Sequence, residues 1–496
     1  MLKVTEMTGM FRKWAGICAV LCFCLPALTT AQEGYRMEVD LRGYDNDTLL
    51  LAYYMGERQL IKDTAFRSGE GVFVFEWDEP IDPGMYMVVE MHEMNFFQLL
   101  VDEGENDLQI SAEHGNITES IEISGSPQNS AFYKYLAYLD EHRKKADRLR
   151  EEMEELPEEE REALQEQLNG IDERVLNHQK ELAEEYGEKF FGVFLKANME
   201  PKMPEFEGTD EEVRRERFRY FRKNFFENID LTDARLLRSP VLATKVHQYL
   251  DQVVPRHPDS INKAVTLILD EMEENRTVFR YFLPNLLNKY ARSNIIGMDA
   301  VYVHIIDTYY RQDRAPWTNE EQLNQILERA DRMRPVLIGK TAPDITVQDR
   351  EGARVRLHDL DYEIMVLYFW RPDCGHCRRY TPRIIEFLYE FEDRGVGVVT
   401  ICTKFTDEVE TCWDYIDRTE GAEDLFNLVD PFHRSRFSVK YDVRSTPMIY
   451  ILDADKEILS KRLSADQLFD VVPMFLDDDE EAMEMLEDET PTGTGL

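Results

Sequence analysis

An apolar run that leads directly into two closely spaced cysteines restricts the fold of this chain more than any other feature. Residues 364–370 read IMVLYFW, and Cys374 and Cys377 follow three positions apart. An unbroken apolar run of this length is typical of a strand buried on both faces of a sheet. From residue 377 to about 391 the apolar spacing is helical. We therefore expect the cysteines at a strand-to-helix junction inside an α/β domain.

Two of the three possible roles of this cysteine pair are weakly supported. A structural zinc site needs four ligands, and the pair Cys374 and Cys377 supplies two. Cys402 and Cys412 lack the spacing of a second such pair, and His376 points elsewhere if the motif begins a helix. A purely structural disulfide across so short a loop removes little chain entropy. No metal site is therefore predicted here.

The third role, a redox-active dithiol, has a positive physical argument. Cys374 at a helix N-terminus lies beside unpaired N–H groups and the positive end of the helix dipole, which stabilise a thiolate. His376, Arg378 and Arg379 add local positive potential. Cys377, one turn into the helix, is placed to attack a mixed disulfide formed at Cys374. The pattern therefore favours thiol–disulfide exchange.

The other two cysteines of the last third, Cys402 and Cys412, are less informative. Cys402 ends an apolar segment that should form a strand beside residues 364–370, so its thiol is expected near the pair. We expect two buried apolar thiols, with an auxiliary disulfide or relay as the alternative.

Length and charge limit the other possibilities. A chain of 496 residues is too long for one core, so about two to four domains are expected. The formal charge of −40 would repel phosphates, which excludes nucleic acid as a natural partner.

The N-terminal segment has the pattern of an export signal. Three basic residues precede an apolar stretch over residues 14–28, which is too short for a membrane span, and small residues end at Ala31. We predict a signal peptide over residues 1–31 and a periplasmic location. The residues before the three cysteines of this segment, AGI, AVL and LCF, do not give the small-residue approach that a lipobox needs, so no lipid anchor is expected.

The first two thirds of the remaining chain change from strand to helical patterning. Residues 32–127 contain short β-prone runs separated by Gly, Asp, Asn and Pro, which predicts an antiparallel β-sandwich that serves for folding or docking. Residues 128–335 are helical, with Pro157 and Gly170 as expected breaks.

The last third contains the four cysteines that follow the predicted signal peptide. Residues 336–476 alternate strands and helices and end in a hairpin, which predicts the α/β domain. Residues 477–496 are strongly acidic, and we expect this tail to be disordered.

The segment FWRPDCGHCRRYTP resembles the active site of the thioredoxin fold. Trp370 stands four residues before the first cysteine, and Pro382 five after the second. RSTPMIY resembles the second signature of that family, in which Pro447 forms a cis bond with Thr446. The hairpin-like stretch IGKTAPDITVQDREGARVRLHDL is similar to the opening of the TlpA/ResA-like branch. The resemblance covers about residues 336–475.

The rest of the chain resembles domains that accompany this module in Bacteroidota. The β region, which ends in ISGSPQN, is similar to an uncharacterised N-terminal domain. The segment FFENIDLTDARLLRSP and the helices after it resemble a helical domain of unknown function. These resemblances imply architecture and no chemistry.

Two positions depart from the family pattern. Tyr368 stands where many thioredoxins carry a buried Asp, and Tyr380 where ResA-like members often carry a Glu. The carboxylate expected to move the proton of Cys377 is missing from both places. The Gly-His pair between the cysteines is that of protein disulfide isomerases, in which the histidine favours the thiolate.

The resemblance implies an exported thiol–disulfide oxidoreductase that reduces or isomerises protein disulfides without a cofactor. Cys374 would attack the client disulfide, and Cys377 would resolve the mixed disulfide. A membrane thiol transporter would supply electrons. The remaining candidate site residues, expected to shape the client groove or tune the thiol, are Trp370, His376, Thr446 and Pro447.

A binding function is the alternative. The part of the chain before residue 336 would then recognise an envelope client as a scaffold, with the dithiol vestigial or regulatory. A peroxiredoxin is disfavoured, because its Pro-x-x-x-Thr-x-x-Cys pattern is absent from this sequence.

Overall fold

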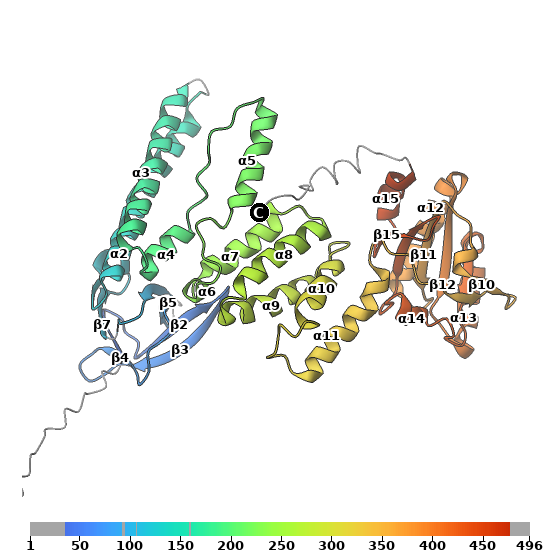
Figure 1. Cartoon of the computed structure of the whole chain (residues 1–496), viewed down its shortest axis with the longest axis horizontal. Coiled ribbons are helices and arrows are strands. Elements are labelled where there is room, and N and C mark those ends of the chain that lie inside the picture. The colour runs from blue at the N-terminus through green and yellow to red at the C-terminus, as the bar shows by residue number, and fades with distance from the viewer. Residues whose placement is uncertain (1–34, 92–94, 106, 158–159, 477–496) are drawn as a thin grey trace, which may run out of the picture.

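A computed structural model describes residues 35–91, 95–105, 107–157 and 160–476. Three parts follow one another along its longest axis: paired sheets, a helical middle and a C-terminal sheet flanked by helices (Figure 1). The predicted order of β, helical and α/β parts is confirmed. The predicted signal peptide and acidic tail lie outside the described residues. Within these ranges, no helix has the length and apolar character needed to cross a membrane.

The N-terminal part is a sandwich of two four-stranded sheets. One sheet has the order β4-β1-β7-β8 and the other β3-β2-β5-β6. The pairing is antiparallel except between β1 and β7, which run parallel. Facing side chains of both sheets, such as Val39, Leu51 and Phe75, form one buried core. The strands are β1 (Tyr35–Arg42), β2 (Thr48–Met55), β3 (Arg58–Phe66), β4 (Phe73–Trp77), β5 (Gly84–Glu90), β6 (Phe96–Val101), β7 (Asp107–Glu113) and β8 (Glu122–Ser124).

The helical part begins with two long helices that lie side by side (Figure 1). The break predicted at Pro157 is confirmed, but the one at Gly170 is wrong, since this glycine lies inside α3. Leu168 and Ile171 on either side of it are buried with Ala146 of α2, and this packing outweighs the cost of about 1 kcal/mol for a helical glycine. The short helix α1 (Ile117–Ser120) precedes this part and lies between β7 and β8. The helices of this part are α2 (Pro127–Glu155), α3 (Glu162–Tyr186), α4 (Phe190–Ala197), α5 (Asp210–Asn224), α6 (Ala234–Leu237), α7 (Pro240–Gln248), α8 (Pro258–Met272), α9 (Arg276–Ala291), α10 (Asp299–Ile305) and α11 (Glu320–Met333), with short π-helices η2 (Tyr249–Val253) and η3 (Ile306–Tyr310).

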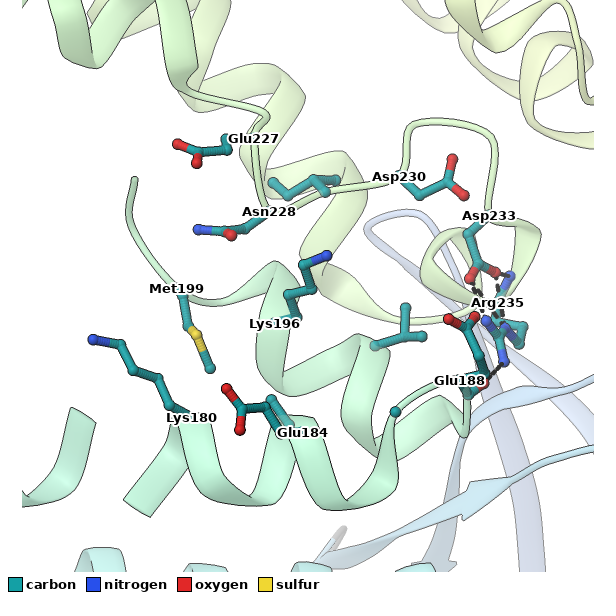
Figure 2. A pocket seen from close by; sticks show the side chains of 14 residues that line it. Lys180, Glu184, Glu188, Lys196, Met199, Glu227, Asn228, Asp230, Asp233 and Arg235 are labelled. Atoms are coloured by element: carbon teal, nitrogen blue, oxygen red, sulfur yellow. Dashed lines mark hydrogen bonds and ion pairs between the residues drawn. The ribbon is translucent and has the colours of Figure 1, made fainter. Parts of the chain in front are cut away.

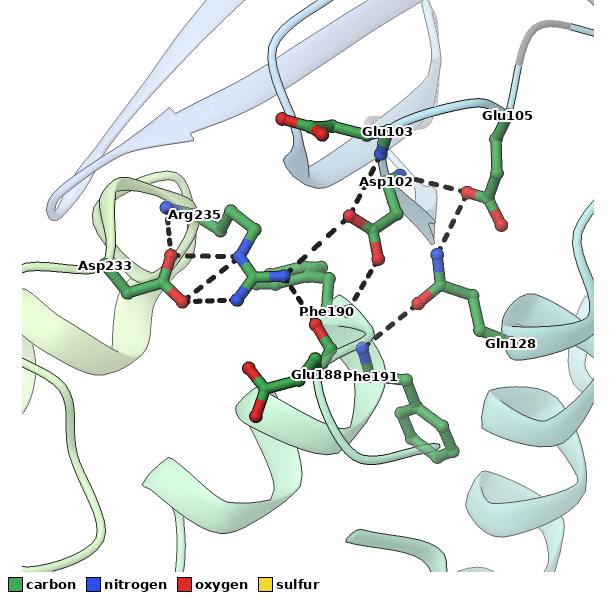
Figure 3. A network of polar contacts seen from close by, with 9 residues as sticks. All are labelled: Asp102, Glu103, Glu105, Gln128, Glu188, Phe190, Phe191, Asp233 and Arg235. Atoms are coloured by element: carbon green, nitrogen blue, oxygen red, sulfur yellow. Dashed lines mark hydrogen bonds and ion pairs between the residues drawn. The ribbon is translucent and has the colours of Figure 1, made fainter. Parts of the chain in front are cut away.

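A buried polar network joins the sandwich to the helices (Figure 3). Helix α4 has no side-chain cap of its own. Instead, the N–H of Phe190 donates to the carboxylate of Asp102 at 2.9 Å, and that of Phe191 donates to the Gln128 side chain at 3.0 Å. The Arg235 guanidinium lies 3.8 Å from the same Asp102 carboxylate. Because orphan N–H groups at a helix start need acceptors, these contacts hold α4 against the end of β6.

The C-terminal part is a seven-stranded sheet of order β10-β9-β13-β12-β11-β14-β15. Strand β11 is buried on both faces, as its apolar run predicts. Tyr368 and Trp370 face the side covered by α12, α13 and α15, and Leu367 and Phe369 face the opposite core. The elements are β9 (Thr346–Gln348), β10 (Arg354–Arg356), β11 (Ile364–Trp370), β12 (Val396–Cys402), β13 (Phe426–Val429), β14 (Met448–Asp453), β15 (Ile458–Lys461), α12 (Gly375–Phe391), α13 (Glu410–Arg418), α14 (Phe437–Lys440) and α15 (Gln467–Leu476).

A buried ion pair joins the helical part to this sheet. Lys461 of β15 lies 2.5 Å from the carboxylate of Asp299 at the start of α10, and both side chains are almost fully buried. Lys461 also donates to the carbonyl of Val336, in the turn that follows α11. Burial lowers the pKa of Lys461, and Asp299 opposes that shift. The contacts of Lys461 with Asp299 and with the Val336 carbonyl fix α11 beside the C-terminal sheet, where Figure 1 also places it.

Candidate redox site

The strand-to-helix junction places Cys374 at the start of α12. Strand β11 ends at Trp370, and Cys374 is the residue that caps α12, with its Sγ accepting the Cys377 N–H at 3.3 Å. Cys374 is half-buried and Cys377 fully buried, and both are free thiols. The Cys374 thiol also donates to the carbonyl oxygen of Thr446 at 3.3 Å. One sulfur is therefore accessible and the other lies directly behind it.

The two thiols have pKa values shifted in opposite directions. Burial opposes ionisation of Cys374, but hydrogen bonds from the Cys377 thiol and N–H and from the His376 N–H outweigh it and lower its pKa. Burial, together with the hydrogen bond to Cys374, raises the pKa of Cys377 to about 11. The accessible sulfur is thus the better thiolate, as a nucleophile requires.

The loop before β14 faces the dithiol. The Thr446–Pro447 peptide bond is cis, as the sequence signature predicts. Both residues are half-buried and line a groove of about 550 Å³ beside α12. The structure therefore brings Thr446 and Pro447 together with the cysteines, although about 70 residues separate them along the chain.

The other two predicted site residues, Trp370 and His376, differ in burial and in their contacts. Trp370 is buried and its ring packs against Tyr415 at 5.2 Å between centroids, while its indole N–H has no partner among the described residues. His376 is exposed, and its ring nitrogen accepts from Arg379 at 2.8 Å. The part of His376 that contacts the Cys374 sulfur is its backbone N–H, not its ring.

The two tyrosines at the carboxylate positions have different surroundings. Tyr368 is buried, and its hydroxyl donates to the Cys377 carbonyl oxygen at 3.4 Å, which also accepts from Thr381 at 3.0 Å. Burial raises the pKa of Tyr368 far above its usual value. Tyr380 is half-buried and lines the groove. Among the described residues, no carboxylate contributes to the shifted pKa of Cys377.

Cys402 and Cys412 form a disulfide, so the expectation of two separate thiols is wrong. Cys402 is the last residue of β12 and pairs with Trp370 across the sheet, while Cys412 lies in the first turn of α13. The connection between these elements folds back and brings the two Cα atoms within 6.4 Å. This is a distance a disulfide spans, and the ten-residue separation in sequence did not indicate it.

Sequence reasoning missed one wall of the groove, because it comes from another part of the chain. Arg329 and Met333 of α11 line the groove with His376, Tyr380 and the loop before β14. A local motif carries no signal for such a contact. The contacts of Lys461 with Asp299 and with the carbonyl of Val336, just after α11, place α11 beside the C-terminal sheet and so create it.

A second hollow lies in the helical part (Figure 2). It measures about 660 Å³ and lies between α3, α4 and the segment before α6. Its lining holds both positively charged lysines and negatively charged carboxylates. Arg235 at its edge belongs to the network that joins the sandwich to the helices. The described residues contain no cluster of three or more metal-ligating side chains, here or elsewhere.

Comparison with known proteins identifies two parts of the chain. Residues 338–461 match the AhpC/TSA family, and residues 163–333 match a domain of unknown function, DUF5106. The thiol-disulfide oxidoreductase ResA of Bacillus cereus is 27% identical over 124 residues, which are 25% of this chain and 68% of that protein. A ResA of Bacillus thuringiensis is 33% identical over 70 residues, 14% of this chain and 40% of that protein.

A solved structure is also similar. A thioredoxin-like protein from Bacteroides caccae is 18% identical, with a TM-score of 0.45, over 56% of this chain and 98% of that chain. The resemblance to ResA-like proteins predicted from the cysteine motif is confirmed. The chain therefore carries a C-terminal thioredoxin-like domain related to ResA thiol-disulfide oxidoreductases, preceded by a DUF5106 helical domain and an N-terminal β-sandwich.

Proposed function

We propose that this protein is an exported thiol–disulfide oxidoreductase that reduces or isomerises disulfides of envelope proteins through Cys374 and Cys377. The observation that carries the proposal is the geometry of Cys374. Cys374 is half-buried, and its sulfur caps α12 and accepts the Cys377 N–H. The pKa of the Cys374 thiol is lowered, whereas the pKa of the buried Cys377 thiol is raised. A nucleophile in front of a resolving thiol is the arrangement that disulfide exchange needs.

The first step forms a mixed disulfide. The Cys374 thiolate attacks one sulfur of the client disulfide, whose S–S bond breaks, and the second client sulfur leaves as a thiolate. The groove lined by Thr446 and Pro447 lies beside the Cys374 sulfur, which favours client binding there. If the released client thiolate attacks another client disulfide, and the thiolate freed in that exchange attacks the mixed disulfide so that Cys374 leaves as a thiolate, the net result is isomerisation.

The second step completes reduction. Cys377 loses its proton and attacks the Cys374 sulfur. The client sulfur that was bound to Cys374 leaves as a thiolate, and a Cys374–Cys377 disulfide remains. Two electrons have then passed to the client. The neutral Tyr368 cannot act as a base because of its raised pKa, so the thiolate released in the first step, or water, takes the Cys377 proton. A thiol donor, which we propose to be a membrane transporter, reduces the enzyme again.

Insulin reduction by the full chain with dithiothreitol tests the proposal. We expect Cys374→Ser to lower the rate to the uncatalysed level, because the nucleophile is gone. Cys377→Ala should retain the first attack but turn over more slowly than the wild type, because dithiothreitol must then release the mixed disulfide in place of Cys377. If Cys374→Ser reduces insulin at the wild-type rate, the redox function is wrong and the client-binding alternative gains.

A further inference from the structure

The DUF5106 domain completes the groove beside the dithiol. Arg329 and Met333 of α11 line it opposite residues of the thioredoxin-like domain, namely Arg444, Pro447 and Arg462. The buried ion pair between Lys461 and Asp299 holds the two domains in this arrangement. The groove therefore has walls from both domains.

Positive charge dominates this groove. Its lining holds three guanidinium groups and one carboxylate, a surplus of two positive charges in a chain whose formal charge is −40. The carboxylate, Asp442, is buried and lies 2.8 Å from Arg444 and 3.9 Å from Arg462. The side chains of these two arginines are 47% and 41% exposed. Asp442 therefore orients two arginines whose guanidinium groups still reach solvent.

Arg329 adds a cation with no anionic partner among the described residues. Its guanidinium donates to the carbonyl of Ala291 at 2.8 Å and lies 4.8 Å from the centre of the Tyr302 ring. Its Nε is buried and has no hydrogen-bond partner. Arg329 is therefore held in place by neutral groups, which leave its charge uncompensated.

Arginines from the two domains converge on one place. Burial raises the pKa of Tyr302, and the charges of Arg329 and Arg444 both act on its phenol in the opposite direction. The two guanidinium groups are thus close enough to act on the same group from separate domains. An anionic group that entered the groove would be attracted by both.

We propose that the groove binds an acidic segment of a client protein next to the disulfide under attack, and that Arg329 of the DUF5106 domain contributes to this preference. The inference rests on the proposed function, since Cys374 must react with the client. It assigns to the helical domain a role in client selection. Exposed and half-buried ion pairs of this kind each change an affinity by up to about fivefold, so the preference is modest and sensitive to salt.

Two fluorogenic disulfide peptides test the proposal. The two residues beside the cysteine are both Glu in one peptide and both Gln in the other, and the peptides are otherwise identical. The reduced full chain reduces the disulfide of each peptide. At low salt we expect the Glu peptide to react about five- to tenfold faster, with a ratio that shrinks at about 0.5 M salt because the ions screen the charges from one another. Equal rates for the two peptides would overturn the proposal.

Matched variants assign the effect to the groove. Arg329→Gln should lower the Glu-to-Gln ratio about two- to threefold. Arg332→Gln, on the same helix but outside the groove lining, should leave the ratio as it is. If Arg329→Gln fails to fold, Arg462→Gln on the opposite wall makes the same test. A ratio unaffected by both groove variants contradicts the proposal.

Two further outcomes distinguish the redox function, the charge preference and the acidic tail from one another. If the wild type reduces neither peptide, the proposed redox function fails, whereas equal reduction of both refutes the charge preference alone. A chain that lacks residues 477–496 should show the same ratio. A several-fold rise of the Glu-to-Gln ratio on this deletion would show that the acidic tail occupies the groove in the full chain, and would overturn the client proposal.

Discussion

Two cysteine pairs in one domain have opposite properties. Cys374 and Cys377 are free thiols at the start of α12, and one of them is half-exposed. Cys402 and Cys412 form a disulfide, and both are fully buried. The pairs are neighbours, because Cys402 lies opposite Trp370 on the adjacent strand. Position at this end of the sheet therefore does not decide which pair can react.

The difference lies in access and in stabilisation of the thiolate. Cys374 sits at a helix N-terminus, where backbone N–H groups reach its sulfur. The second pair joins the end of β12 to the first turn of α13 within the apolar core, out of reach of a client. These differences favour the first pair for the proposed disulfide exchange, whereas the second holds α13 to the sheet.

Covalent trapping should separate the pairs most sharply. Cys377→Ala leaves Cys374 able to attack but removes the resolving thiol, so mixed disulfides with proteins should accumulate in cells. They are detected as bands on a non-reducing gel that dithiothreitol removes. The matched control, Cys374→Ser with Cys377→Ala, retains the second pair and should trap nothing. Equal trapping by the control would contradict the assignment of Cys374 as the nucleophile.

Alkylation should distinguish the two thiols of the first pair. Below the lowered pKa of Cys374 its thiol is protonated and slow, and above it the thiolate reacts, so the iodoacetamide rate rises with pH and levels off. The alkylation rate of Cys377, whose pKa is about 11, rises only in strong base. At pH 7 Cys374 should hold at least about a hundredfold more thiolate. Peptide mapping by mass spectrometry gives both rates, and preferential labelling of Cys377 would refute the assignment.

Removal of the second pair should change stability more than activity. A disulfide that closes a loop of about ten residues stabilises a fold by about 2–3 kcal/mol through its effect on the unfolded chain. Cys402→Ala with Cys412→Ala should lower the free energy of unfolding in urea by that amount, while insulin reduction stays within about twofold. A loss of activity as large as that of Cys374→Ser would show that this disulfide takes part in the electron transfer.

The smallest effect is expected from Tyr368→Phe. The change removes one hydrogen bond to the Cys377 carbonyl, worth about 1 kcal/mol, so the resolving step should slow by about three- to fivefold. Single-turnover decay of the mixed disulfide measures this step. Tyr389→Phe, at an exposed position of α12, should have no effect. A loss of a hundredfold or more would mean that Tyr368 transfers the proton, contrary to its raised pKa.

Much of the site could be predicted because its signals are local. The buried strand, the helix after it and the spacing of Cys374 and Cys377 place the thiols without reference to distant residues. The cis bond at Pro447 followed from a short signature. Gly170 was mispredicted as a break, because core packing on both sides of it outweighs the helix propensity of one residue.

The sequence by itself determined the strand-to-helix junction, the place of Cys374 and Cys377 on it and the order of the three parts, because hydrophobic periodicity and helix capping act over neighbouring residues. Only the tertiary structure decided that Cys402 meets Cys412 and that Arg329 faces Pro447 across a groove. Such contacts depend on how α13 and α11 pack against the sheet. Packing is a property of surfaces that meet in the folded chain, and no local pattern encodes it.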